Sequence, residues 1–246
     1  MKHILKLALA VLAAMFSLRA AAVGSLADVT VFDRSDGRAL PVTWHEGRAY
    51  VVGRPGNEYQ IRVRNRQGED LLAVMSVDGV NVVTGETAAV HQSGYVLGPG
   101  RALELKGWRK DLSRTAAFYF TSLPDSYAAR TGRPDHVGAI GVALFRKKRP
   151  EPAMDMGPLS GEAPAAAKAE ARAAERDSAL GTGHGRNEHS PARQVAFERA
   201  TSAPAETVVI YYDSYRNLVA RGILPRTPQP RPLPQPFPGF VADPPA

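Results

Sequence analysis

The sequence predicts a mainly β protein: an antiparallel β-sandwich, jelly-roll or immunoglobulin-like, followed by a small α+β accessory segment. About nine short apolar or alternating runs follow one another between residues 28 and 147, separated by Gly, Pro, Asn and Asp. This is the pattern of closely spaced strands joined by turns. No helix-length periodic segment lies between the runs, so the helices that a doubly wound α/β fold needs between its strands are missing.

The most apolar stretch of the chain after its first residues lies between residues 71 and 100, and we expect the rest to pack around it. The apolar run 71–77 meets a turn at Asp78-Gly79, and a second run, 80–83, follows directly. A third run, 95–97, ends in Gly-Pro-Gly. An Asp-Gly pair between apolar runs is a strong hairpin signal, so strand, turn, strand, loop and strand are predicted here.

Further strands are expected on both sides of this stretch. In the run 58–66, Tyr59, Ile61 and Val63 alternate with Gln60, Arg62 and Arg64, which predicts one buried and one exposed side. The exposed arginines are typical of a solvated sheet face, and they could also bind an anionic partner. The other expected strands are 28–34, 40–45, 48–52, 101–108, 115–123 and 138–145, with one helical turn at 127–130.

The predicted organisation has five parts. They are a signal peptide (1–22), a β-sandwich domain (28–147), a linker with an Ala/Glu/Arg-rich helix (148–179), an accessory loop–strand–helix segment (180–224) and a proline-rich disordered tail (225–246). In the tail, proline disfavours both strand ladders and helices, so polyproline II or disorder is expected.

The accessory segment is expected to pack on or beside the sandwich. Its residues 180–189, LGTGHGRNEH, are predicted to form a glycine-rich loop, and residues 194–200 a short helix. The bulky run 206–212 is predicted to be a strand, which the sandwich could accept as an addition. A helix at 215–221, capped by Asp213 or Ser214, should follow.

The first residues predict export from a bacterial cell to the periplasm or beyond. Two lysines precede an apolar run too short to span a bilayer comfortably, and Ala20-Ala21-Ala22 offers a cleavage site. A second possible cut lies after Ala27, and an uncleaved anchor is the alternative. The chain contains no cysteine, so it has neither a disulfide nor a lipid-attachment cysteine. No later run is long enough for a transmembrane helix.

The charge is mildly basic. The formal net charge is +7, and without Lys2, Lys6 and Arg19 of the signal, 28 Lys and Arg stand against 24 Asp and Glu. No dense basic patch with interleaved aromatic residues is present, so a nucleic-acid partner is not expected. A protein partner in the cell envelope is the leading expectation, and a glycan or an anionic surface is possible.

Three residues could hold a metal ion. His184, Glu188 and His189 lie close in sequence and carry side chains that ligate zinc or similar ions. Their spacing matches no established ligand motif, and a loop with two histidines is the simpler interpretation. Neither a phosphate-binding glycine motif nor G-x-S-x-G is present. No catalytic residue and no cofactor is therefore predicted.

Four other residues are candidate contacts for a ligand or partner. Asp78 and Asn81, together with Thr84 and Glu86, could offer oxygen ligands to Ca²⁺, although Asp78-Gly79 and Thr84-Gly85-Glu86 are more simply turn formers. Trp108 and Arg109 could stack on a sugar or peptide, although a core anchor is the usual role of a tryptophan at a strand end. Trp108 together with Trp44 supports a glycan-binding alternative, by analogy with other sandwich proteins only.

Several segments resemble a group of uncharacterised exported bacterial proteins. The resemblance covers most of residues 28–223, and it implies that the later segment belongs with the sandwich. It implies no activity, cofactor or site. The segments are SVDGVNVVTGETA (76–88), SGYVL (93–97), GWRK (107–110), AAFYF (116–120), SYAARTGRP (126–134), GAIGVALF (138–145), LGTGHG (180–185) and YYDSYRNLVARGI (211–223).

Taken together, the sequence predicts an exported, non-enzymatic binding or scaffolding module. The alternatives are a metal-dependent, hydrolase-like enzyme built on His184, Glu188 and His189, or a glycan-binding module.

Overall fold

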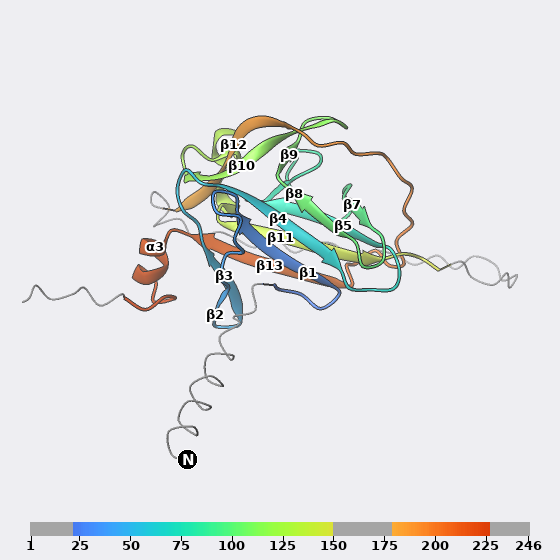
Figure 1. Cartoon of the computed structure of the whole chain (residues 1–246), viewed down its shortest axis with the longest axis horizontal. Coiled ribbons are helices and arrows are strands. Elements are labelled where there is room, and N and C mark those ends of the chain that lie inside the picture. The colour runs from blue at the N-terminus through green and yellow to red at the C-terminus, as the bar shows by residue number, and fades with distance from the viewer. Residues whose placement is uncertain (1–21, 150–178, 227–246) are drawn as a thin grey trace, which may run out of the picture.

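Two β-sheets form this protein, and the computed structural model describes residues 22–149 and 179–226 of the chain. The two sheets face each other (Figure 1). Their inner side chains make up the main hydrophobic core. The predicted mainly β fold is therefore confirmed. Among the described residues, no helix is long and apolar enough to cross a membrane.

Sheet A has six strands, in the order β1-β4-β10-β12. Two short strands complete it, since β8 pairs with β4 and β9 pairs with β10. All its pairings are antiparallel. The strands are β1 (Ala27–Asp33), β4 (Glu58–Asn65), β8 (Ala102–Leu105), β9 (Gly107–Arg109), β10 (Arg114–Ser122) and β12 (Leu180–His189).

Sheet B has seven strands, in the order β2-β3-β13-β11-β5-β6, with β7 paired to β5. Only the β3–β13 pair is parallel. Two α-helices and one 3₁₀ turn connect or cover the sheets: α2 (Tyr127–Arg130), η1 (Pro134–His136) and α3 (Tyr215–Ala220). The strands are β2 (Thr43–His45), β3 (Arg48–Val52), β5 (Leu71–Val77), β6 (Val80–Asn81), β7 (Tyr95–Leu97), β11 (Ala139–Arg146) and β13 (Glu206–Asp213).

Local sequence accounts for several of these elements. In β4, Tyr59, Ile61 and Val63 have no solvent exposure, as their alternation predicts. The β5–β6 hairpin turns at Asp78 and Gly79, whose φ angles are 52° and 71°. Two successive positive φ angles are what a two-residue hairpin turn requires.

The outer face of sheet B is covered at two places. Near one end, Leu218 of α3 and Ile223 pack on Tyr50 of β3. Elsewhere, Phe197 packs on a cluster that includes Leu72 and Phe145, and the Arg199 guanidinium lies 4.4 Å from the Phe145 ring centroid. The side chains that cover this face at both places come from the part of the chain after residue 179.

The prediction of a glycine-rich loop at 180–189 was wrong, because these residues form β12 along β10. Close packing explains why glycine occupies positions 183 and 185 of this strand. A Cβ atom on Gly183 would lie 2.2 Å from the Tyr119 ring, and one on Gly185 would lie 2.8 Å from the Ala117 carbonyl oxygen. Real Cβ atoms do not approach other atoms this closely, so only glycine lets Tyr119 lie across β12.

The short helix predicted at 194–200 was also wrong. The segment is extended, and its end pairs with the end of β11 through a bridge between Lys147 and Arg199. Arg199 also donates hydrogen bonds to the carbonyl oxygens of Val90, His91 and Gln92. These long-range bonds hold the backbone extended, which a local helix signal could not reveal.

Residues 180–224 pack with the sandwich, as predicted, and contribute one strand to each of its sheets. The predicted strand and helix are present as β13 and α3, and Ser214 caps α3 by accepting a hydrogen bond from Asn217 N at 3.2 Å. However, β13 lies between β3 and β11 in the interior of sheet B. The predicted linker helix at 165–176, and nearly all of the predicted signal peptide and tail, lie outside the described residues.

The contacts made by residues 23–27 differ in their consequences for the two predicted cleavage sites, after Ala22 and after Ala27. Val23 forms a bridge with Val29, and the carboxylate of Glu206 accepts hydrogen bonds from Ser25 N (2.7 Å) and Leu26 N (2.6 Å). Ala27 is fully buried in β1. A cut after Ala27 would remove all of these contacts.

If the chain is exported, as its first residues predict, we therefore expect the mature protein to begin at Val23. The measurement is the intact mass and N-terminal sequence of the protein recovered from a periplasmic fraction. A mature chain that begins at Asp28 would contradict this prediction.

Candidate functional site

An exposed tryptophan marks a pocket at the edge of sheet B. Trp44 of β2 is 57% exposed, whereas most large hydrophobic side chains in the described residues are buried. The pocket beside it has a volume of about 370 Å³. Strands β2, β3 and β13 and the residues before β1 line it: Val23, Gly24, Trp44, Gly47, Arg48, Ala49, Glu206, Thr207, Val208, Val209 and Tyr211. We call it the Trp44 pocket.

A tight hairpin presents Trp44. Strands β2 and β3 turn at Glu46 and Gly47, whose φ angles are 48° and 72°. Trp44 pairs with Ala49 across this hairpin. Strand β2 is the outermost strand of the sheet, so no further described strand covers the tryptophan.

The pocket combines apolar and charged groups. Val209 is 36% exposed, and Arg48 is exposed beside it. The Glu206 carboxylate is held in place by the two backbone N–H groups of residues 25 and 26. An exposed indole with a fixed carboxylate and an exposed guanidinium nearby can bind a ligand that has both an apolar face and polar edges.

Asp78, a predicted contact, instead lies in the interior and is fully buried. Its Oδ1 accepts hydrogen bonds from the Tyr212 hydroxyl (2.5 Å) and Gly138 N (2.9 Å), and its Oδ2 accepts one from Thr182 N (2.7 Å). The carboxylate therefore joins the turn after β5 to both β12 and β13.

A chain of hydroxyl groups continues from Asp78 into sheet A. Thr182 Oγ1 lies 2.6 Å from the Tyr212 hydroxyl and 2.6 Å from the Tyr59 hydroxyl. Because the Tyr212 proton is used on Asp78, its oxygen accepts from Thr182, which in turn accepts from Tyr59. We call these four residues the Asp78 relay.

Burial sets the ionisation of the Asp78 relay. It raises the pKa of the Asp78 carboxyl from 3.8 to about 6, against the hydrogen bonds that favour the charged form. Burial, together with the Asp78 charge, also raises the pKa of Tyr59 and of Tyr212 well above 10. The relay has no solvent-exposed member, so it is a structural connection between the sheets.

The other predicted contact residues also serve the fold. Asn81 is fully buried and its Oδ1 accepts a hydrogen bond from Val83 N at 2.7 Å. Trp108 is 4% exposed, and its Nε1 donates to the Gly183 carbonyl oxygen. Arg109 donates to the Tyr95 hydroxyl and to Ser190. These contacts join loops and strands, as the core-anchor interpretation of Trp108 predicts.

The structure does not bring the predicted metal ligands together. His184, Glu188 and His189 are spread along β12, where they pair with Phe118, Thr115 and Arg114 of β10. Glu188 instead forms ion pairs with Arg34 (2.8 Å) and Arg186 (2.6 Å). In residues 22–149 and 179–226, no three His, Cys, Asp or Glu side chains are grouped to hold a metal ion.

The surroundings of His184 are also unfavourable for a cation. Partial burial lowers the pKa of His184 below 6.5, and the nearby charges of Lys110 and Arg130 lower it further. A metal ion would meet the same repulsion.

Fold and site together define a two-sheet β-sandwich protein with a small aromatic pocket at one sheet edge. No protein-family model, curated protein or solved structure matches the chain. The resemblance to a group of exported bacterial proteins therefore stays a prediction.

Sequence reasoning named Trp44 but not Arg48, Glu206 or Tyr211. These residues meet only because β13 pairs in parallel with β3, and no local pattern in the sequence indicates that pairing.

Proposed function

We propose that this protein is a non-enzymatic binding module of the bacterial cell envelope, and that its ligand occupies the Trp44 pocket. The exposure of Trp44 beside a formed pocket carries the proposal. Single exposed hydrophobic residues are common and need no explanation. Trp44 differs because Tyr211, Arg48 and Glu206 surround the same pocket, and tryptophan, tyrosine and arginine are the residues that dominate binding sites.

A carbohydrate is the ligand that the pocket favours. Pyranose rings have an apolar face, which can stack on an indole, and hydroxyl edges, which can bond to Arg48 and Glu206. The volume of about 370 Å³ suits a small group rather than a protein domain. A protein partner in the envelope, the leading expectation from the sequence, would need a larger surface around Trp44.

Replacing Trp44 by alanine should weaken carbohydrate binding by tenfold or more and leave the melting temperature unchanged. The reason is that a stacked indole is a major contact of such a ligand, while an exposed side chain contributes little to folding. The measurement is co-sedimentation with purified peptidoglycan and titration with soluble oligosaccharides. Leu112→Ala is the matched control, since Leu112 is 54% exposed and does not line the pocket.

Two results would reject the carbohydrate proposal: no binding of either probe by the wild type, or equal binding by Trp44→Ala. Crosslinking capture from native envelopes with the same two variants tests the protein-partner alternative. A partner that is lost with Trp44→Ala and retained with Leu112→Ala would show that the pocket binds protein.

A further inference from the structure

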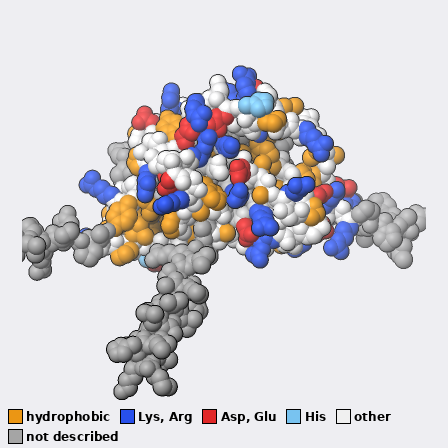
Figure 2. Space-filling view, viewed as in Figure 1, with side chains coloured by type: hydrophobic (Ala, Val, Ile, Leu, Met, Phe, Trp, Pro, Cys, Tyr) orange, Lys and Arg blue, Asp and Glu red, His pale blue; other side chains and the backbone are white. Residues whose placement is uncertain are grey.

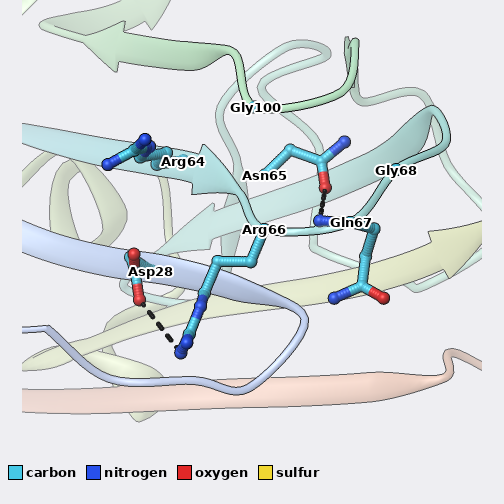
Figure 3. A pocket seen from close by; sticks show the side chains of 7 residues that line it. All are labelled: Asp28, Arg64, Asn65, Arg66, Gln67, Gly68 and Gly100. Carbon is cyan, nitrogen blue, oxygen red and sulfur yellow. Dashed lines mark hydrogen bonds and ion pairs between the residues drawn. The ribbon is translucent and has the colours of Figure 1, made fainter.

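A second basin lies at the end of β4, in sheet A, and it is polar. Its volume is about 620 Å³. Figure 3 shows its lining: Asp28, Arg64, Asn65, Arg66, Gln67, Gly68 and Gly100. A Cβ atom on Gly68 or on Gly100 would meet nothing within 4 Å, so these residues leave the basin open. We call it the Arg64 basin.

The floor of the Arg64 basin is rigid. Asn65 is 1% exposed, and its Nδ2 donates hydrogen bonds to the carbonyl oxygens of Glu69, Leu97 and Gly98. Its Oδ1 accepts one from Gln67 N at 2.8 Å, the bond drawn in Figure 3. The backbone that carries the two neighbouring arginines is therefore fixed from inside the protein.

The two arginines leave positive charge available in the basin. Arg62, earlier on the same strand face, is neutralised by Glu104 at 2.8 Å. Arg64 is exposed, and its guanidinium forms no ion pair or hydrogen bond with the side chains and backbone that the structure describes, although its backbone pairs with Asp28 of β1. The Arg66 side chain is 54% exposed, and its one ion pair among residues 22–149 and 179–226 is a 3.5 Å contact with Asp28. Such exposed pairs contribute little and are easily exchanged.

Positively charged side chains outnumber negatively charged ones in the Arg64 basin. Figure 2 shows Lys and Arg side chains over the whole visible face, with Asp and Glu among them. Within the basin itself, two guanidinium groups stand against one carboxylate. Arg64 and Arg66 are two residues apart at the end of β4, where alternate residues share a face, so both long side chains can turn toward one anion. Such an anion would compete with the exposed Asp28–Arg66 pair and displace no buried group.

We propose that the Arg64 basin binds a phosphoryl group through Arg64 and Arg66. Guanidinium groups present planar pairs of donors that match phosphate oxygens, and the fixed floor reduces the entropy lost when the anion binds. The group comes either from a soluble phosphate ester or from a phospholipid headgroup. The site is separate from the Trp44 pocket, so it extends the proposed function and does not depend on it.

The test uses the full mature protein and three probes: inorganic phosphate, glycerol phosphate, and phosphatidylcholine vesicles with and without phosphatidylglycerol. The variant is Arg64→Gln/Arg66→Gln. The matched control is Arg38→Gln/Arg193→Gln, which removes the same charge from two exposed arginines outside the basin. All of these side chains are exposed, so the melting temperatures should agree with that of the wild type.

We expect the basin variant to lose about tenfold or more in affinity and the control to bind like the wild type. Binding of the soluble esters identifies a free phosphate ester as the source, and binding only to phosphatidylglycerol vesicles identifies a headgroup. Either supports the site when the basin variant loses it. The proposal is overturned if the wild type binds no probe, if the basin variant binds as well as the wild type, or if the control loses as much affinity.

Discussion

Ending the chain after Arg149 should abolish cooperative folding. The shortened chain lacks β12, an edge strand of sheet A, and β13, which lies between β3 and β11 in sheet B. Without β13, the β2–β3 hairpin loses the strand that, within the described part of the chain, connects it to the rest of sheet B. The Asp78 relay would also lose Thr182 and Tyr212.

Removing the residues after Arg149 lowers the free energy of unfolding by as much as the whole stability of a typical domain. In the described residues 179–226, six apolar side chains are buried: Leu180, Val208, Ile210, Tyr212, Leu218 and Ile223. Burial of one such side chain contributes about 1.5–3 kcal/mol, so their removal costs on the order of 10 kcal/mol. Native domains are stable by roughly 5–15 kcal/mol in total.

The measurement is denaturant unfolding followed by near-ultraviolet circular dichroism. A chain that ends after Arg226 is the control, since it keeps all described residues and should unfold at the same midpoint as the full chain. A cooperative transition in the shorter chain would show that residues 28–147 fold without β12 and β13, and would contradict this prediction.

Replacing Asp78 by alanine should destabilise the protein by about 3–5 kcal/mol. Three buried donors, Gly138 N, Thr182 N and the Tyr212 hydroxyl, would lose their acceptor. Each unsatisfied buried group costs about 1–3 kcal/mol, and partial rearrangement reduces the sum. Asp36→Ala, in an exposed turn, should have a much smaller effect. Equal destabilisation by both variants would contradict the role of the relay.

The contribution of Asp78 to stability should depend on pH in an unusual direction. Because its pKa is raised from 3.8 to about 6, the folded state holds a proton that the unfolded state releases. The stability linked to this proton is fully present below about pH 4 and is lost as the pH rises through about 6. The difference in pKa corresponds to roughly 3 kcal/mol.

The comparison with Asp78→Asn isolates this effect. Asparagine tolerates the positive φ angle at this position and does not titrate. Other carboxylates act in the opposite direction, such as Glu58, whose pKa is lowered by the hydrogen bond from Arg186. We therefore expect the unfolding free energy of the wild type minus that of Asp78→Asn to increase as the pH falls from 7.5 to 4. A constant or decreasing difference would contradict the prediction.

The sequence by itself determined the elements that depend on near neighbours. Residues 48–52, 71–77 and 95–97 are strands with the predicted bounds, and 127–130 is the predicted helical turn. Alternating side chains and Asp-Gly or Gly-Pro turns act within a few residues, so a reader of the sequence can recognise them. The two-sheet class followed from their number and spacing.

Only the tertiary structure decided what depends on distant pairs. LGTGHGRNEH has no apolar alternation, and it is a strand because β10 pairs with it and Tyr119 lies over Gly183. The sequence did not show that Asp78 would meet Tyr212, 134 residues later, or that β13 would bring Tyr211 toward Trp44. In a β-sandwich, hydrogen bonds and buried contacts join segments that are far apart in sequence. Local sequence patterns therefore do not reveal which segments will meet.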